Sequence, residues 1–135
     1  MNGYLLDACA LIALLNDENG ADKVESLLNG SEPVLMSAIN MLEVAYDAVR
    51  RSGGNTDAAS LCLQLAQNEG IEVLWALSEP DWLAAARWKA RGRLSLADAI
   101  ALAVSETRKL KLVSADHHEL DVLVSAGLVD VEWIR

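Results

Sequence analysis

The sequence predicts one α/β domain, residues 1–135, built on a mostly parallel five-stranded sheet flanked by helices. Short apolar runs typical of buried strands alternate along the chain with longer segments of helical character. No Gly-, Pro- or Ser-rich tract offers a linker and no internal repeat is present, while 53% hydrophobic residues suffice for one core. A single domain is therefore expected.

Five segments are predicted to be strands because they are short and rich in apolar or β-branched residues. They are residues 3–7 (GYLLD), 33–37 (PVLMS), 71–75 (IEVLW), 111–116 (KLVSAD) and 128–134 (LVDVEWI). The last segment alternates in polarity, so we expect it at an edge of the sheet.

Helices are predicted between these strands, where alanine and leucine dominate or helical caps occur. They cover residues 8–16, 21–29, 38–51, 56–70, 79–92 and 93–105, and residues 117–126 are predicted as a short connecting helix or turn. Ser37 and Ser95 occupy N-cap positions, and Gly70 stops the fourth helix.

The charge balance argues against nonspecific nucleic-acid binding through a global positive field, because the net charge is −9. Basic residues nevertheless gather on both sides of residues 93–105, as solvated helix ends or as a rim for a polyanion. They are Arg87, Lys89, Arg91 and Arg93, which lead up to the start of this stretch, and Arg108, Lys109 and Lys111, which follow it.

The N-terminal segment lacks a basic leader, and Asp7 interrupts its apolar run. It is therefore predicted to be neither a signal peptide nor a membrane span, and a cytoplasmic protein is expected. Cys9 and Cys62 are isolated in the sequence, so we expect two small buried thiols rather than a metal site or a disulfide.

Asp98 is the one carboxylate in the apolar stretch RLSLADAIALAVS, residues 93–105. A local explanation is available, because Ser95 and Asp98 have the spacing of a capping box. Glu43 raises a similar question, since it shares a helix face with Ile39, Leu42 and Tyr46, where a buried carboxylate is unusual. A different rotation of the helix would expose it.

Four acids occur in related places: Asp7 and Asp116 end strands, and Glu43 and Asp98 lie in the first turns of helices. All four are expected to converge at one edge of the sheet, where α/β domains bind ligands. Clustered carboxylates repel, and no lysine or arginine lies at the strand ends beside these acids, so a divalent cation is expected.

Oxygen ligands favour Mg²⁺ or Mn²⁺ over zinc, and such ions serve phosphoryl transfer by activating a water for in-line attack. His117 and His118 adjoin Asp116, but neighbouring residues of a helix point in different directions, so we expect neither to be a metal ligand.

The motifs LLDACALIALL, SAINMLEV, LSLADAIALAVS and KLVSAD, in that order, resemble those of the PIN domain, in particular the small VapC-type toxins of toxin–antitoxin pairs. The resemblance implies an endoribonuclease that depends on Mg²⁺ or Mn²⁺. It also implies a homodimer and a cognate antitoxin that blocks the active-site groove.

The resemblance further implies roles for individual residues. Asp7, Glu43, Asp98 and Asp116 match the family's acidic quartet, with Asp7 and Asp98 as the principal metal ligands. Ser114 and Asn40 match polar residues that support the carboxylates or contact the substrate phosphate. Cys9 departs from the pattern, because the family often has serine or threonine at that position.

Two other classes of protein remain as alternatives. A noncatalytic interaction module on the same α/β scaffold would show no dependence of its thermal stability on divalent ions. A phosphate-transfer receiver domain is disfavoured, because that class has two adjacent acids after the first strand and a lysine after the last.

Overall fold

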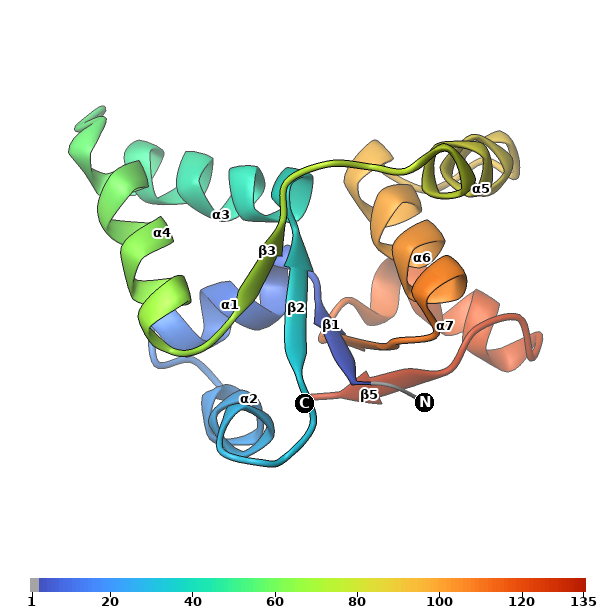
Figure 1. Cartoon of the computed structure of the whole chain (residues 1–135), viewed down its shortest axis with the longest axis horizontal. Coiled ribbons are helices and arrows are strands. Elements are labelled where there is room, and N and C mark those ends of the chain that lie inside the picture. Colours follow the sequence, from blue (N-terminus) through green and yellow to red (C-terminus); the bar gives the residue numbers. More distant parts are fainter. Residues whose placement is uncertain (1–2) are drawn as a thin grey trace.

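The computed structural model describes residues 3–135, and its elements alternate as the sequence predicts (Figure 1). The strands are β1 (Tyr4–Leu6), β2 (Val34–Ser37), β3 (Glu72–Leu74), β4 (Lys111–Ser114) and β5 (Val131–Trp133). The helices are α1 (Ala8–Leu15), α2 (Ala21–Leu28), α3 (Ala38–Arg51), α4 (Asp57–Asn68), α5 (Glu79–Ala90), α6 (Leu96–Arg108) and α7 (His117–Ser125). Within the described residues, no helix combines the length and the apolar character needed to cross a bilayer.

The sheet has the strand order β3-β2-β1-β4-β5, and each neighbouring pair is parallel. The predicted parallel sheet is confirmed, with β5 at an edge. The chain leaves β1 toward β2 on one side and later returns to β4 on the other, so the order reverses between β1 and β4. This switch point places the carboxyl ends of β1 and β4 next to each other, which is where ligands bind in such sheets.

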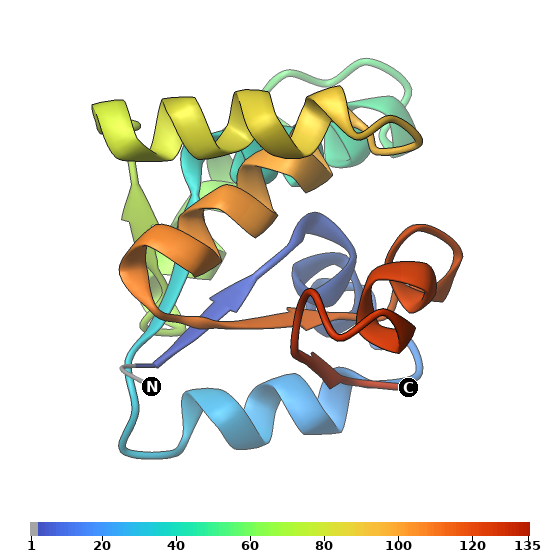
Figure 2. The ribbon, with the colours of Figure 1, turned by 90° about the vertical axis from the view of Figure 1, so that its right-hand side faces the viewer.

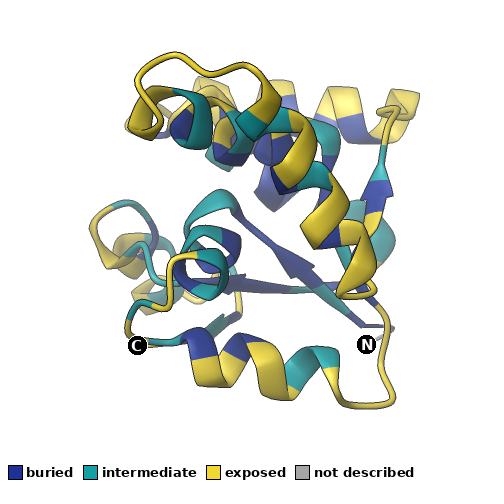
Figure 3. Cartoon of the chain, turned by 90° about the vertical axis from the view of Figure 1, so that its left-hand side faces the viewer, coloured by how far each residue is buried: buried dark blue, intermediate teal, exposed yellow. Residues whose placement is uncertain are grey.

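The central strands are buried on both faces, because helices cover the sheet from either side (Figure 3). Leu5 and Leu6 are both fully buried but belong to separate core clusters, since successive strand residues point to opposite faces. Leu5 packs with apolar residues of α5, α6 and α7, and Leu6 packs with those of α1 to α4. The molecule therefore has three layers with the sheet in the middle.

Helix α5 crosses over α6 on one side of the sheet (Figure 2). A buried polar connection joins the two helices: the Asp81 carboxylate, 1% exposed, accepts hydrogen bonds from Thr107 Oγ1 and from Arg108 Nη2, the latter at 2.9 Å. Asp81 also accepts from the backbone N–H of Ser78, which completes a capping box at the start of α5. This connection joins the start of α5 to the end of α6.

Candidate active site

Asp7 and Asp116 are placed by the same local device, an aspartate that leaves a strand and caps the following helix. Asp7 Oδ1 accepts a hydrogen bond from the Ala10 N–H at 3.0 Å, and Asp116 Oδ1 accepts from the Glu119 N–H at 3.1 Å. Because β1 and β4 are neighbours in the sheet, the two caps lie side by side. Asp7 is only 3% exposed.

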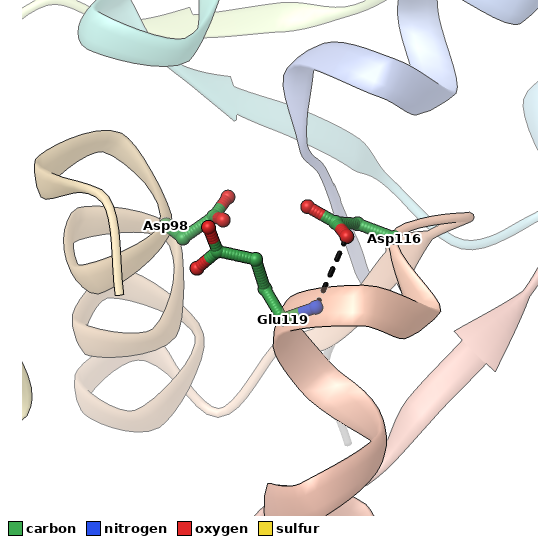
Figure 4. A group of neighbouring side chains, drawn as sticks. All are labelled: Asp98, Asp116 and Glu119. Carbon is green, nitrogen blue, oxygen red and sulfur yellow. Dashed lines mark hydrogen bonds between the residues drawn. The ribbon is translucent and has the colours of Figure 1, made fainter. Parts of the chain in front are cut away.

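Asp98 lies in the first turn of α6, where the prediction of a capping box is only half correct. The Ser95 hydroxyl accepts from the Asp98 N–H at 3.1 Å, as that motif requires. In a capping box the Ser95 N–H would donate to the Asp98 carboxylate in return. Here it donates to Glu119 Oε2 instead, at 3.3 Å. The Asp98 carboxylate is consequently not used for capping, and it points toward the acids of α7 (Figure 4).

Glu119 is a site residue that the sequence analysis did not identify. Carboxylate oxygens of Asp98, Asp116 and Glu119 all lie within 4.8 Å of one another, and the three side chains converge in Figure 4. The available signal was its position three residues after the Asp116 cap. The prediction of residues 117–126 as a short connecting helix or turn gives no reason to assign Glu119 a function.

The acids line a cavity of about 310 Å³ at the carboxyl edge of the sheet. We call this the acidic cavity; its lining residues are Asp7, Ala8, Cys9, Ile12, Glu43, Ser95, Asp98, Asp116 and Glu119. Five carboxylates therefore meet in one cavity whose lining contains no lysine or arginine. The predicted convergence of the four acids is seen here, with Glu119 added.

Glu43 reaches this cavity from the second turn of α3 and not from the first turn, as the sequence analysis expected. The helix face that it shares with Leu42 and Tyr46 is turned to solvent, with those side chains 63% and 64% exposed. The apolar residues of this face had suggested burial. They are instead part of an exposed apolar surface.

Asn40 does not line the acidic cavity but is fully buried beneath it. Its Oδ1 accepts from Ser37 Oγ at 2.6 Å, and its Nδ2 donates to the carbonyl oxygen of Ala97 at 3.3 Å. Asn40 thus joins the start of α3 to the first turn of α6, and it holds the backbone next to Asp98.

Cys9 and Ser114 connect the turns after β1 and β4. Cys9 Sγ donates to Asp7 Oδ1 at 3.1 Å, accepts from the Ala115 N–H at 3.3 Å and lies 3.5 Å from Ser114 Oγ. Ser114 Oγ in turn accepts from the Asp116 N–H at 2.9 Å. The expectation of a plain buried thiol holds for Cys62 but is wrong for Cys9, which lines the acidic cavity.

Burial and mutual repulsion raise the pKa values of three of these acids, and so disfavour their simultaneous ionisation. Burial, followed by the charges of Asp7, Asp116 and Glu119, raises the pKa of Asp98 to about 7. Burial also raises the pKa of Asp7, partly opposed by the polar groups of Ser114, Cys9 and the Ala10 backbone. The pKa of Glu43 is raised by burial and by Asp7. Such a cluster is stabilised by a cation, and its oxygen donors fit Mg²⁺ or Mn²⁺.

The neighbouring histidine and most of the basic residues are engaged elsewhere. His117 Nδ1 bonds Asp121 at 2.9 Å, its Nε2 bonds the Arg135 carbonyl at 2.8 Å, and its ring stacks on Trp133, so both ring nitrogens have partners outside the acidic cavity. Arg108 ends α6, ten residues beyond Asp98 and therefore about 15 Å along the helix. The basic group after α6 does not rim the acidic cavity.

The raised pKa of Asp98 predicts how the stability of the metal-free protein depends on pH. In the unfolded chain Asp98 has its ordinary pKa of 3.8, so the folded protein binds this proton more tightly. The stabilisation is complete below about pH 4 and is lost as the pH rises through about 7. After discounting for partial exposure, we expect a loss of about 1–2 kcal/mol, or a Tm lower by about 5 °C, between pH 5 and pH 8 in EDTA.

The control for this measurement is Asp98→Asn, which lacks the titrating group. Hydrogen bonding to Arg135 and Asp121 raises the pKa of His117, and that group gives a pH dependence of the same sign in both proteins. The difference between the two melting curves therefore reports Asp98 together with its repulsion of the neighbouring acids. Parallel pH dependence of the parent and the variant would contradict the prediction.

The protein therefore belongs to the class of α/β domains whose parallel sheet carries a cluster of carboxylates at its carboxyl edge, at the point where the strand order reverses. The chain belongs to the PIN domain family, which matches residues 4–122. The resemblance inferred from the four motifs is therefore confirmed. No curated protein matches the sequence.

Solved structures with the same fold include VapBC toxin–antitoxin proteins. VapBC2 from Rickettsia felis, bound to a promoter DNA fragment, matches with a TM-score of 0.73 at 12% identity over 96% of this chain and 97% of that one. DNA-bound VapBC from Salmonella typhimurium gives a TM-score of 0.71 at 17% identity over 100% of both chains. VapC20 of Mycobacterium tuberculosis, a sarcin-ricin loop cleaving toxin, gives 0.70 at 20% identity over 96% and 98%.

Proposed function

We propose that this protein is an endoribonuclease that hydrolyses RNA phosphodiester bonds with Mg²⁺ or Mn²⁺. The observation that carries the proposal is the convergence of five carboxylates, without a basic residue, in the acidic cavity. Membership of the PIN family and a fold shared with a sarcin-ricin loop cleaving toxin support RNA as the substrate.

The acids of the cavity have two kinds of role in the proposed reaction: some hold the metal ion and some orient the attacking water. Asp98, Asp116 and Glu119 would hold the ion with Asp7 beside them, and the bound ion would supply an acidified water and neutralise charge on the phosphate. Glu43 and Asp116 orient the attacking water. Water oxygen bonds to phosphorus as the bond to the leaving sugar oxygen breaks. A carboxylate accepts the water proton, and the leaving oxygen takes up a proton from solvent water. The caps of α1 and α7 hold Asp7 and Asp116 in place, and the cap of α1 is buried.

The test is cleavage of a mixed RNA substrate by purified protein in Mg²⁺, Mn²⁺ or EDTA. We expect cleavage with either ion and none in EDTA. Asp98→Asn, purified in parallel, controls for contaminating ribonuclease and should be inactive. Equal cleavage by both proteins, or no cleavage by the parent, would reject the proposal, and a Tm unaffected by divalent ions would favour the noncatalytic interaction module.

We further propose that the enzyme is the toxin of a toxin–antitoxin pair and acts on cytoplasmic RNA. Support comes from fold neighbours that are themselves toxin–antitoxin complexes, from Klebsiella pneumoniae, Rickettsia felis and Salmonella typhimurium. An adjacent reading frame should encode a small DNA-binding protein that co-purifies with this chain and inhibits its cleavage of RNA.

A homodimer is proposed from the exposed apolar residues of α3, of α5 and of the segment after β3. These parts of the chain lie along one side of the molecule (Figures 1 and 2). Leu42, Trp75 and Trp82 are 63%, 64% and 63% exposed there. Apolar surface of this kind is typical of a protein–protein interface.

Leu42→Asp is expected to convert the dimer to a monomer, because the interface would then have to bury an unpaired charge. The change should weaken dimerisation roughly 100-fold, as measured by light scattering of the eluted protein across a concentration series. Val122→Asp on α7 is the matched control, since Val122 is 72% exposed outside this surface. A parent protein that is monomeric at all concentrations would contradict the prediction.

A further inference from the structure

A second cavity, of about 500 Å³, adjoins the acidic cavity and shares Glu119 with it. We call it the cationic cavity. It lies between the loop that joins α5 to α6 and the exposed side of α7, and its lining residues are Arg91, Gly92, Arg93, Leu94, His118, Glu119, Val122 and Leu123. Apart from the shared Glu119, its lining residues take no part in the proposed hydrolysis.

The two arginines of this cavity differ from most basic residues of the protein, because they form no ion pair with an acid among residues 3–135. Seven of the eleven lysines and arginines form ion pairs with acids: Lys23, Arg50, Arg51, Arg87, Arg108, Lys111 and Arg135. The other four have no such partner among residues 3–135: Lys89, Arg91, Arg93 and Lys109. Two of the four, Arg91 and Arg93, line the cationic cavity. In a chain of net charge −9, uncompensated cations are therefore concentrated next to the acids.

Local contacts hold part of the loop that joins α5 to α6 in place. Lys89 Nζ donates to the carbonyl oxygen of Leu94 at 2.6 Å, which ties the end of α5 to the loop. The Arg91 guanidinium lies over the Trp88 ring at 5.7 Å from its centroid. Arg93 has neither kind of contact among the described residues, so its guanidinium is available to a ligand.

The opposite wall of the cavity is apolar and aromatic. Val122 is 72% exposed, an unusual environment for valine, and Leu123 and the His118 ring line the same wall. A cavity with guanidinium groups on one side and apolar and imidazole surfaces on the other suits a ligand that is itself anionic at one end and flat at the other. A nucleotide has this chemistry, through its phosphate and its base.

We propose that the cationic cavity binds the nucleotide next to the scissile phosphate of single-stranded RNA. The base packs against Val122, Leu123 and His118, and the phosphate of that nucleotide pairs with Arg93 and Arg91. This inference rests on the proposed function, because the shared residue Glu119 sets the cavity beside the reacting phosphate. It also explains how an acidic protein binds a polyanion: substrate phosphates meet arginines directly beyond the metal-binding acids.

The test measures binding of a fluorescent ten-nucleotide single-stranded RNA in Mg²⁺, in an Asp7→Asn background that should not cleave it. Arg93→Gln is expected to raise the Kd about fivefold and to reduce the slope of log K against log salt by about 0.7. Lys109→Gln is the matched control, because it removes another cation without an ion pair, at the far end of α6. It should change neither quantity.

The apolar wall is tested separately with Val122→Ser, which is tolerated by the fold because the side chain is exposed. We expect it to raise the Kd about fourfold, the loss for roughly one buried methylene. Leu61→Ser, at a position on α4 that is 56% exposed, is its control and should bind RNA as the background protein does.

The outcomes separate this inference from the proposed nuclease activity. Equal effects of Arg93→Gln and Lys109→Gln would mean general electrostatic attraction and would overturn the inference. So would an effect of Arg93→Gln with none of Val122→Ser, because an anion-binding patch, open equally to an acidic peptide, would then suffice. If the parent protein cleaves RNA while both cavity variants bind normally, the nuclease proposal stands and the cavity proposal fails. If the variants lose binding but the parent cleaves nothing, the nuclease proposal fails, and with it the placement beside a scissile phosphate, while the cavity remains a binding site for single-stranded RNA.

Discussion

Asp7→Asn is expected to reduce RNA cleavage at least 100-fold and at the same time to raise the Tm of the metal-free protein. Cleavage should fall because a carboxylate beside the metal-binding acids is lost, and removing one such electrostatic group typically costs about 10²–10³ in rate. The Tm should rise because ionisation of Asp7, 3% exposed, is disfavoured first by burial and then by repulsion from Asp116, as its raised pKa indicates. Asparagine removes that charge and still offers an oxygen to the Ala10 N–H.

The two measurements are the initial rate of RNA cleavage in Mg²⁺ and the Tm in EDTA. Asp22→Asn is the control, because Asp22 is exposed in the first turn of α2 and does not line the acidic cavity. It should cleave like the parent and melt within about 2 °C of it. A variant at Asp7 that loses activity together with stability would point to misfolding instead of a lost catalytic group.

Asp81→Ala is expected to cause the largest loss of stability of any single acid, about 2–3 kcal/mol, with a Tm lower by about 10 °C. The substitution removes the acceptor for Thr107, Arg108 and the Ser78 N–H. It also leaves the partly buried guanidinium of Arg108 without an acid, although its Nε already lacks a partner. Chemical denaturation measures the loss, and Glu79→Ala, exposed in the same turn of α5, should change stability little.

The same contact should make the parent protein sensitive to acid. Burial opposes ionisation of Asp81, but hydrogen bonds from Thr107, the Ser78 backbone and Arg108 outweigh it and lower the pKa to about 2. The resulting stability is complete above the unfolded pKa of about 3.8 and disappears as the pH falls through about 2. Asp81→Asn should therefore lose less stability than the parent between pH 5 and pH 2. Equal losses would show that this carboxylate does not couple the helices.

Much of the fold was predictable because the evidence for it is local. The alternation of short apolar runs with Ala- and Leu-rich segments reports strands buried on both faces, and the N-cap residues Ser37 and Ser95 mark where helices begin. Asp7 and Asp116 could be assigned to strand ends for the same reason. Local pattern also has a limit, shown by α3: its Ile39, Leu42 and Tyr46 suggested a buried face, yet all three are exposed.

The sequence by itself determined the α/β class, the order of the elements and four of the acids of the candidate site, because each of these depends on residues close together in the chain. Only the tertiary structure decided which groups distant in the sequence contact one another. Glu119 joins the site because α7 packs beside the start of α6, where it takes the Ser95 N–H that a capping box would have given to Asp98. Likewise, ion pairs with acids distant in sequence neutralise Arg87 and Arg108 but not Arg93. The meeting of Asp7 with Asp116 depends on the strand order, which brings β1 beside β4 across more than a hundred residues of chain, and no local periodicity encodes that order.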